Sequence, residues 1–251
     1  MFDLKGRVAV VTGASGGLGR QFALALAKQG ADIAILARRE HKMAEVAEEV
    51  RAFGVKCLCV KTDVTLLDEV KNAAKAVFAE FGKVDILVNN AGGGAGRAMA
   101  ELLDDEWDHT IKLNLYGTMY CTREFGAKMV ERGYGRVINI SSILGAGGLP
   151  EIPVSPYHAA KGGQTNFTRG LAAEWAKTGV TVNALCPGFF PSQANHAEAM
   201  EAMSGFINAR TPMGRAGVDG ELDSSIVFLA AEESSYVTGV ILYCDGGWTC
   251  V

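Results

Sequence analysis

The 251-residue sequence lacks the cysteine and histidine patterns of a disulfide-bonded or metal-binding protein. None of its six cysteines forms a C-x-x-C pair, and several lie inside apolar runs such as Leu58-Cys59-Val60. Cysteines in such a setting are expected to be reduced and buried. A zinc site needs clustered ligands, whereas the four histidines are scattered along the chain. We therefore expect neither disulfides nor a bound metal.

Long apolar segments and a strong excess of one charge are also missing. The longest apolar runs are strand-sized, which is too short for a transmembrane helix. The N-terminus lacks the apolar middle region of a signal peptide, and no lipidation motif stands out at either end. The 28 acidic and 24 basic residues form no basic stripe, so nucleic acid is a poor partner. The sequence predicts a cytoplasmic protein that binds neither nucleic acid nor membrane.

The sequence does contain an alternation of apolar runs and helical patterns from end to end. The runs are apolar or β-branched throughout, which predicts strands buried on both faces of a parallel sheet. The stretches between them carry apolar residues three or four positions apart, as helices on a sheet do. The predicted strands are Arg7–Thr12, Asp32–Ala37, Lys56–Lys61, Val84–Asn89, Arg136–Ser141, Thr181–Cys186 and Val240–Cys244. The predicted helices include Arg20–Gln29, Arg39–Phe53, Leu67–Phe81, Ser155–Lys177 and Leu222–Ala231.

Repeated strand–helix units predict an α/β protein with a Rossmann-like, doubly wound fold, in which helices cover both faces of a seven-stranded parallel sheet. No linker or repeat interrupts the chain, so we expect one domain over residues 1–251. The Gly- and Pro-rich segment Ile143–Pro156 and the region Phe189–Arg215 break the alternation. Both follow a strand's carboxyl end, where such sheets bind ligands. We interpret residues 189–215 as a substrate loop.

A glycine-rich loop follows the first predicted strand, with the sequence Thr12-Gly13-Ala14-Ser15-Gly16-Gly17-Leu18-Gly19. Glycines let the backbone turn tightly and approach a pyrophosphate, and the next helix offers free N–H groups and a positive dipole end. The strand before the loop and the helix after it favour dinucleotide binding over a structural turn.

The end of the second predicted strand favours NADP(H) over NAD(H). An NAD enzyme usually carries an acid there for the ribose 2′-hydroxyl, but this chain has Ala37 followed by Arg38 and Arg39. A guanidinium matches a phosphate in geometry and charge. Two solvated arginines at a helix start are the alternative interpretation.

Tyr157 and Lys161 are spaced to share one face of a helix. A phenol has a reference pKa near 10, and a nearby ammonium lowers it. We therefore expect a close, partly desolvated Lys161 to lower the pKa of Tyr157, which could then act as general base or acid. Ser142, at the end of the fifth predicted strand, could hydrogen-bond a substrate oxygen beside the phenol.

The spacing T-G-x-x-x-G-x-G, rather than G-x-G-x-x-G, is where the chain begins to resemble the short-chain dehydrogenase/reductase family of the classical type. The resemblance covers essentially the whole chain, and its C-terminal third is similar to gluconate 5-dehydrogenases and 3-oxoacyl-carrier-protein reductases. Further family motifs follow in order: Asp63-Val64, Asn89-Asn90-Ala91-Gly92, Asn114, Ser142, Tyr157-x-x-x-Lys161, Pro187-Gly188, Thr238-Gly239 and Asp245-Gly246-Gly247.

The resemblance implies roles for residues that the patterns alone do not assign. Asp63 would contact the adenine with Val64 nearby, and Asn114 would support a water-linked proton relay through Lys161. The segment from Pro187 to Ser192 would hold the nicotinamide, although the family often has threonine at the position of Ser192. The implied catalytic residues are Asn114, Ser142, Tyr157 and Lys161. The implied cofactor-binding residues are Gly13, Ser15, Gly17, Leu18, Gly19, Arg38, Arg39, Asp63, Val64, Asn90, Ala91, Gly92, Tyr157, Lys161, Pro187, Gly188, Phe190 and Ser192.

The expected activity is NADP(H)-dependent interconversion of a ketone and a secondary alcohol. The candidate pocket residues carry few charges, which favours a steroid-like or acyl-like substrate. A sugar acid such as gluconate is an alternative within the same class, and a non-catalytic dinucleotide-sensing module is an alternative of another class. Relatives in the family are usually homotetramers and sometimes dimers, so the resemblance implies a homo-oligomer.

Overall fold

A computed structural model describes residues 2–94, 96–191 and 201–251. In this part of the chain seven strands form one parallel sheet in the order β3-β2-β1-β4-β5-β6-β7. The strands are β1 (Val8–Thr12), β2 (Asp32–Ala37), β3 (Cys57–Lys61), β4 (Ile86–Asn89), β5 (Gly135–Ile140), β6 (Val180–Pro187) and β7 (Ile241–Cys244). All seven predicted strands are confirmed to within two residues at each end.

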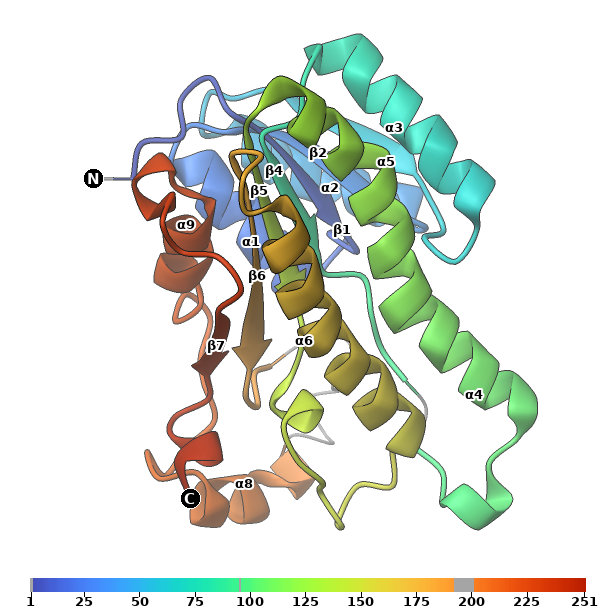
Figure 1. The fold of residues 1–251 in the computed structure, drawn as a ribbon. Helices are drawn as coiled ribbons and strands as arrows, with labels where there is room; N and C mark the ends of the chain where they lie inside the picture. The colour runs from blue at the N-terminus through green and yellow to red at the C-terminus, as the bar shows by residue number, and fades with distance from the viewer. Residues whose placement is uncertain (1, 95, 192–200) are drawn as a thin grey trace.

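Helices cover both faces of the sheet, as predicted (Figure 1). The described helices are α1 (Gly17–Lys28), α2 (Glu40–Arg51), α3 (Leu67–Phe81), α4 (Asp104–Ile111), α5 (Gly117–Arg132), α6 (Ser155–Trp175), α8 (Ser204–Arg210) and α9 (Asp223–Ala230). Helices α1, α2 and α9 contribute to one buried apolar cluster, and α3, α5 and α6 to another. On β1, Ala9 and Val11 belong to the first cluster and Val10 to the second. Because both faces need apolar side chains, the strands read as continuous apolar runs.

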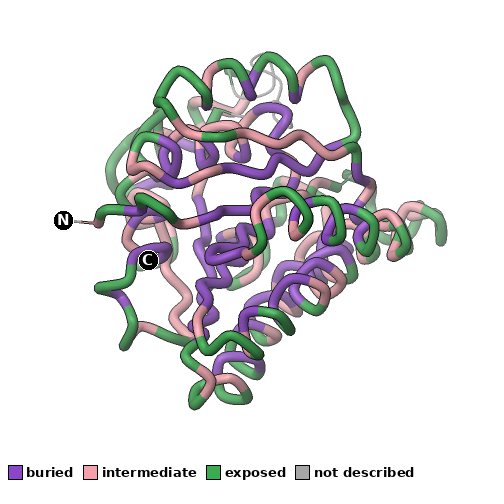
Figure 2. Tube along the Cα trace, turned by 90° about the horizontal axis from the view of Figure 1, so that it is seen from above, coloured by how far each residue is buried: buried purple, intermediate pink, exposed green. Residues whose placement is uncertain are grey.

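Burial falls from the centre of the sheet to its edges. Strands β1, β4, β5 and β6 are buried along their whole length, whereas the edge strands β3 and β7 are mostly half-buried. Figure 2 shows the buried centre enclosed by helices whose outer faces are exposed. Within the described ranges no helix has both the length and the hydropathy needed to cross a membrane.

Helices α4 and α5 were not among the predicted helices. The inward face of α5 includes Thr118, Thr122 and Gly126, so polar and small residues interrupt the apolar period that predicts a helix. Gly126 lies so close to the Trp175 ring that a Cβ would stand 2.6 Å from it. A five-residue π-helical turn, Lys112–Tyr116, joins the two helices.

The strand order places a topological switch point between β1 and β4. The chain moves outward from β1 through β2 to β3, and then from β4 through β5 and β6 to β7. The loops that follow β1 and β4 therefore diverge and leave a crevice at their carboxyl ends. This crevice is where the ligand-binding residues of such a sheet gather.

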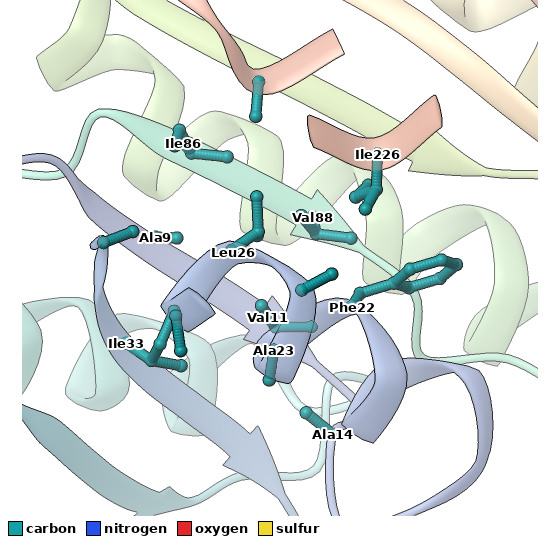
Figure 3. Packing of buried hydrophobic residues seen from close by; sticks show 14 of the residues in the cluster. Ala9, Val11, Ala14, Phe22, Ala23, Leu26, Ile33, Ile86, Val88 and Ile226 are labelled. Atoms are coloured by element: carbon teal, nitrogen blue, oxygen red, sulfur yellow. The ribbon is translucent and has the colours of Figure 1, made fainter. Parts of the chain in front are cut away.

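Replacing Phe22 by Ala tests the packing of α1 against the sheet. Phe22 is fully buried in the first apolar cluster, near Val88 and Ile226 (Figure 3). Loss of its ring should lower the free energy of unfolding by about 3–5 kcal/mol, measured by urea denaturation. Phe53→Ala is the control, because that ring is 47% exposed after α2 and should contribute much less. Equal losses in the two variants would contradict the packing described.

Candidate active site

A groove runs along the carboxyl ends of the strands. Its larger part, a cleft of about 390 Å³, is lined by loops after β1, β4, β5 and β6 and by the start of α6. Its smaller part, about 260 Å³, lies at the ends of β2 and β3. Both parts are lined by Gly13, Arg39, Ala91 and Gly92, so they form one groove across the switch point. We call it the strand-end groove.

The two loops at the switch point are held together by Thr12. Its hydroxyl oxygen accepts hydrogen bonds from the backbone amides of Asn90 and Ala91, both at 2.9 Å, and the Asn90 side chain donates to the Thr12 carbonyl. Gly13 has a φ of +68°, and a Cβ there would stand 2.9 Å from Ala91 Cα. Only glycine combines this backbone conformation with so close an approach.

The glycine-rich loop fits a pyrophosphate. Helix α1 begins at Gly17, earlier than predicted, and its N-cap Gly16 makes no side-chain capping hydrogen bond. The first turn therefore has no side-chain cap for its amides, which suits an anion at this helix end. Gly17, Leu18 and Gly19 line this part of the groove. These observations fit the phosphates of a dinucleotide.

Two arginines lie at the β2–β3 end of the groove, where an adenosine would be held. Arg39 donates from Nε and Nη2 to Ser15 Oγ at 3.2 and 3.0 Å, which places its guanidinium against the glycine-rich loop. The Arg38 side chain is 64% exposed, and its Nη1 is 3.9 Å from Asp63 Oδ2. Val64 is buried in the same wall. Both arginines line this part of the groove, and the contact with Ser15 makes Arg39 the better fixed.

Three candidate catalytic side chains meet at the other end of the groove. Ser142 follows β5 and caps a short 3₁₀ turn, with its Oγ accepting a hydrogen bond from the Leu144 amide at 3.1 Å. The Tyr157 hydroxyl, from the first turn of α6, hydrogen-bonds with Ser142. Lys161 lies one turn further along the helix, with Nζ 5.5 Å from the centre of the Tyr157 ring. Its side chain is buried and donates to the Ile140 carbonyl at 2.7 Å.

The pKa shifts at this end correct one expectation. Burial raises the pKa of Tyr157 to about 12, and the hydrogen bond with Ser142 offsets only part of that rise. Burial lowers the pKa of Lys161 to about 8. Lys161 is therefore desolvated, as expected. The prediction that the pKa of Tyr157 is lowered was wrong for the ligand-free chain. The ammonium lies over the ring and bonds to a carbonyl, so it does not offset the desolvation of the phenolate.

Asn114 is buried in the π-helical turn and holds the loop after β4. Its Nδ2 donates to the Gly93 carbonyl at 2.6 Å, and its Oδ1 accepts from the Gly93 amide at 3.1 Å. Its backbone carbonyl faces α5 and α6 instead, accepting from Thr118 Oγ1 at 2.9 Å and from Gln164 Nε2 at 3.5 Å. Sequence reasoning did not identify Gln164, because a lone glutamine inside a helix carries no motif.

Pro187, Gly188, Phe189 and Phe190 line the groove near Tyr157, whereas Ser192 lies outside the described residues. Leu144 and Ile152 also line the groove. Within the predicted substrate loop, residues 192–200 lie outside the described residues and Ile207 is buried. Within the described ranges no three His, Cys, Asp or Glu residues form a group that could hold a metal ion.

Trp248, near the C-terminus, was also missed. Its ring packs against Phe189 and Phe206, with centroids 5.1 and 5.8 Å apart, and beneath the Arg210 guanidinium. Arg210 is also 3.6 Å from Glu151 in the loop before α6. The C-terminal turn, α8 and that loop thus meet beside the groove. No local pattern predicts contacts between segments so distant in sequence.

A doubly wound sheet with a glycine-rich loop at its switch point is an architecture of dinucleotide-binding enzymes. The family model described as short chain dehydrogenase matches residues 7–202. The chain therefore belongs to the short-chain dehydrogenase/reductase family, as the motifs predicted. It is an NAD(P)-dependent oxidoreductase of CH–OH or keto groups.

Known relatives match nearly the whole chain. A 3-oxoacyl-[acyl-carrier-protein] reductase FabG of Staphylococcus aureus is 37% identical over 240 residues, covering 95% of this chain and 96% of the relative. A 2-dehydro-3-deoxy-D-gluconate 5-dehydrogenase of Pseudoalteromonas atlantica is 39% identical over 249 residues, covering 98% and 97%. The structure of a gluconate 5-dehydrogenase from Burkholderia cenocepacia in complex with NADP and tartrate is 36% identical, with a TM-score of 0.94 and coverage of 100% and 98%.

Replacing Gly19 by Ala tests the glycine-rich loop. A Cβ at Gly19 would stand 2.6 Å from the Gly13 carbonyl oxygen and 2.9 Å from Ala14 Cα, so the loop must shift. We expect the Kd for NADPH, measured by fluorescence titration, to rise about tenfold or more. A rise of this size corresponds to the loss of one charge-assisted hydrogen bond. Gly170→Ala is the control, since a Cβ there has nothing within 4 Å. Equal affinities in the two variants would show that this loop does not hold the cofactor.

Proposed function

We propose that this protein is an NADP(H)-dependent reductase of apolar ketones, in which Tyr157 donates the proton to the carbonyl oxygen. The observation that carries this proposal is the placement of Ser142, Tyr157 and the buried Lys161 in the apolar end of a groove whose other end is lined by two arginines. Bound NADPH supplies the hydride.

The proton chemistry follows from the pKa shifts. With a pKa of about 12, Tyr157 is protonated throughout the neutral range and is therefore in the state that a general acid needs. Ser142, oriented by the Leu144 amide, would hold the carbonyl oxygen beside the phenol. Oxidation needs the phenolate instead, which burial disfavours. The protonation state of Tyr157 in the ligand-free chain is thus the one that the reduction step needs.

Lys161 would supply positive charge next to the phenol as the proton leaves. Its pKa of about 8 leaves most of the amine protonated at neutral pH. Reduction should therefore weaken as the pH rises through that value and the ammonium loses its charge. Asn114 would support this site in two ways. Its side chain holds Gly93, and its backbone carbonyl accepts a hydrogen bond from Gln164 on α6.

The cofactor preference rests on the arginines. Ala37 leaves no carboxylate at the end of β2, while Arg38 and Arg39 line the adjoining part of the groove. A 2′-phosphate would be attracted there, and a charge-assisted hydrogen bond contributes roughly 1.5–3 kcal/mol. The relative from Burkholderia cenocepacia has NADP bound, which supports the same preference.

The substrate class rests on the walls near Tyr157. Among the described lining residues of the larger cleft, the charged side chains are Arg39 at the far end and the buried Lys161. An acyl-like or steroid-like ketone suits such walls better than a free carboxylate does. The apolar walls are formed by Ile143, Leu144, Ile152, Val154, Phe189 and Phe190.

Two alternatives remain open to experiment. The relatives named as gluconate dehydrogenases favour a keto sugar acid as substrate. A non-catalytic dinucleotide sensor would bind NADPH without turnover. We also propose a homotetramer, supported by the half-exposed edge strand β7 and the exposed Leu103 and Tyr116 around α4 and α5.

Initial rates of NADPH oxidation distinguish these functions. The substrates are acetoacetyl thioesters, steroid ketones, small diketones and keto sugar acids, each assayed with NADPH and NADH. We expect the highest kcat/KM with an apolar ketone and NADPH. Preference for keto sugar acids would contradict the proposed substrate class, and tight NADPH binding without turnover on any substrate would favour the sensor.

Tyr157→Phe tests the proton donor. The variant should lose about 10²–10⁴-fold in kcat, the usual contribution of a general acid, while its Kd for NADPH stays within about twofold. Tyr236→Phe, at a fully exposed position, is the control. A Tyr157→Phe enzyme with undiminished kcat would refute the assigned role.

Arg38→Asp and Arg39→Asp test cofactor selection. Each should raise the Kd for NADPH about ten- to a hundredfold and change that for NADH much less, with Arg39→Asp having the larger effect because Ser15 orients its guanidinium. Lys42→Asp on α2 controls for the change of net charge. Equal weakening of both cofactors would contradict recognition of the 2′-phosphate.

A further inference from the structure

A fully buried glutamine lies directly behind the candidate catalytic residues. Gln164 stands on α6 and is 0% exposed. Its Oε1 accepts a hydrogen bond from Lys161 Nζ at 3.3 Å. Its Nε2 donates to Thr118 Oγ1 at 2.7 Å and to the Asn114 carbonyl at 3.5 Å. One amide group therefore joins Lys161 to Asn114.

The surrounding hydrogen bonds fix which way the amide faces. The Thr118 hydroxyl donates its proton to the Asn114 carbonyl, so its oxygen can only accept from Gln164. The amide nitrogen must therefore face Thr118, and the amide oxygen must face the ammonium. The reverse orientation would place N–H groups against an ammonium, where neither group can accept.

Behind Gln164 the same network continues across the sheet. Thr168 Oγ1 donates to the backbone carbonyl of Gln164 at 2.9 Å and accepts from Asn139 Nδ2, also at 2.9 Å. Asn139 in turn accepts from Asn89 at 2.8 Å. All of these side chains are buried. Polar side chains at such depth are costly unless they are hydrogen-bonded, and the Gln164 side chain itself is held by its bonds to Lys161 and Thr118.

We propose that Gln164 is a positioning residue that holds the Lys161 amine in place and in its charged form beside Tyr157. This inference rests on the proposed function, in which Lys161 supplies positive charge during proton transfer. Gln164 acts through Lys161 and does not touch the reacting atoms.

The physical reason is the small number of groups that stabilise this ammonium. Burial lowers the pKa of Lys161 to about 8. Its hydrogen-bond acceptors are the Ile140 carbonyl of β5 and the Gln164 amide oxygen. The titratable groups that face it from the described elements are Tyr157 on α6 and Cys186 on β6, and burial raises the pKa of Cys186 to about 11, which keeps that thiol neutral. Loss of the Gln164 oxygen should therefore lower the pKa of Lys161 further.

Two substitutions at Gln164 change the acceptor in opposite directions. Gln164→Met keeps a side chain of similar size but removes the oxygen, whereas Gln164→Glu keeps an oxygen and adds negative charge. Thr168→Val is the matched control, because Thr168 belongs to the same helix and network but has no hydrogen bond to Lys161.

The direct readout is a ¹³C NMR titration of Lys161 Cε in full-length, ligand-free protein with ¹³C-labelled lysine, assigned with Lys161→Met. The pKa of Lys161 should fall by about one unit in Gln164→Met, the loss of one hydrogen bond to a charged group. It should rise in Gln164→Glu and stay unchanged in Thr168→Val. Thermal melting of each variant separates these shifts from general loss of structure.

The second readout is the pH dependence of kcat for NADPH-dependent reduction. The alkaline decline should move to lower pH by about one unit in Gln164→Met and to higher pH in Gln164→Glu, with KM for NADPH within about twofold. A Lys161 titration that is the same in wild type, Gln164→Met and Gln164→Glu overturns the positioning role. If the titration shifts as expected but the wild type reduces no ketone, the proposed function fails instead. If Gln164→Met does not fold, the upward shift in Gln164→Glu decides the question.

Discussion

The parallel direction of all seven strands is the constraint on which the site depends, because it brings every carboxyl end to one edge of the sheet. The reversal of strand order between β1 and β4 opens a crevice at that edge. Thr12 then ties the two diverging loops together through the Asn90 and Ala91 amides. The glycine-rich loop, the arginines after β2 and the first turns of α6, with Tyr157 and Lys161, consequently lie along one groove.

Burial shifts the pKa values of Tyr157 and Lys161 in opposite directions. It keeps Tyr157 neutral by raising its pKa to about 12, and it brings the pKa of Lys161 down to about 8. Under the proposed function, the neutral phenol is in the protonation state that a general acid needs when a carbonyl oxygen gains charge. The polar network behind them explains why the inward faces of α5 and α6 carry Thr118 and Gln164 where an apolar core would pack more simply.

The sequence predicts those parts of the protein that local patterns determine. Strands buried on both faces are continuous apolar runs. The glycine-rich loop and the pair Tyr157 and Lys161 are recognised by short spacings. Helix α5 could not be predicted, because its inward residues serve a polar network and disturb the apolar period. Gln164 and Trp248 act through contacts between distant segments, which no local spacing records. The direction of the Tyr157 shift depended on burial, which two residues on one helix do not reveal.

The central claim is that the ligand-free chain holds Tyr157 as a protonated acid. A ¹³C NMR titration of the Tyr157 Cζ in protein with labelled tyrosine, assigned with Tyr157→Phe, measures this pKa directly. We predict a value well above the model-peptide value near 10, close to about 12. A pKa near 7 would contradict the account, because Lys161 alone would then stabilise the phenolate and Tyr157 would not be held as a protonated acid.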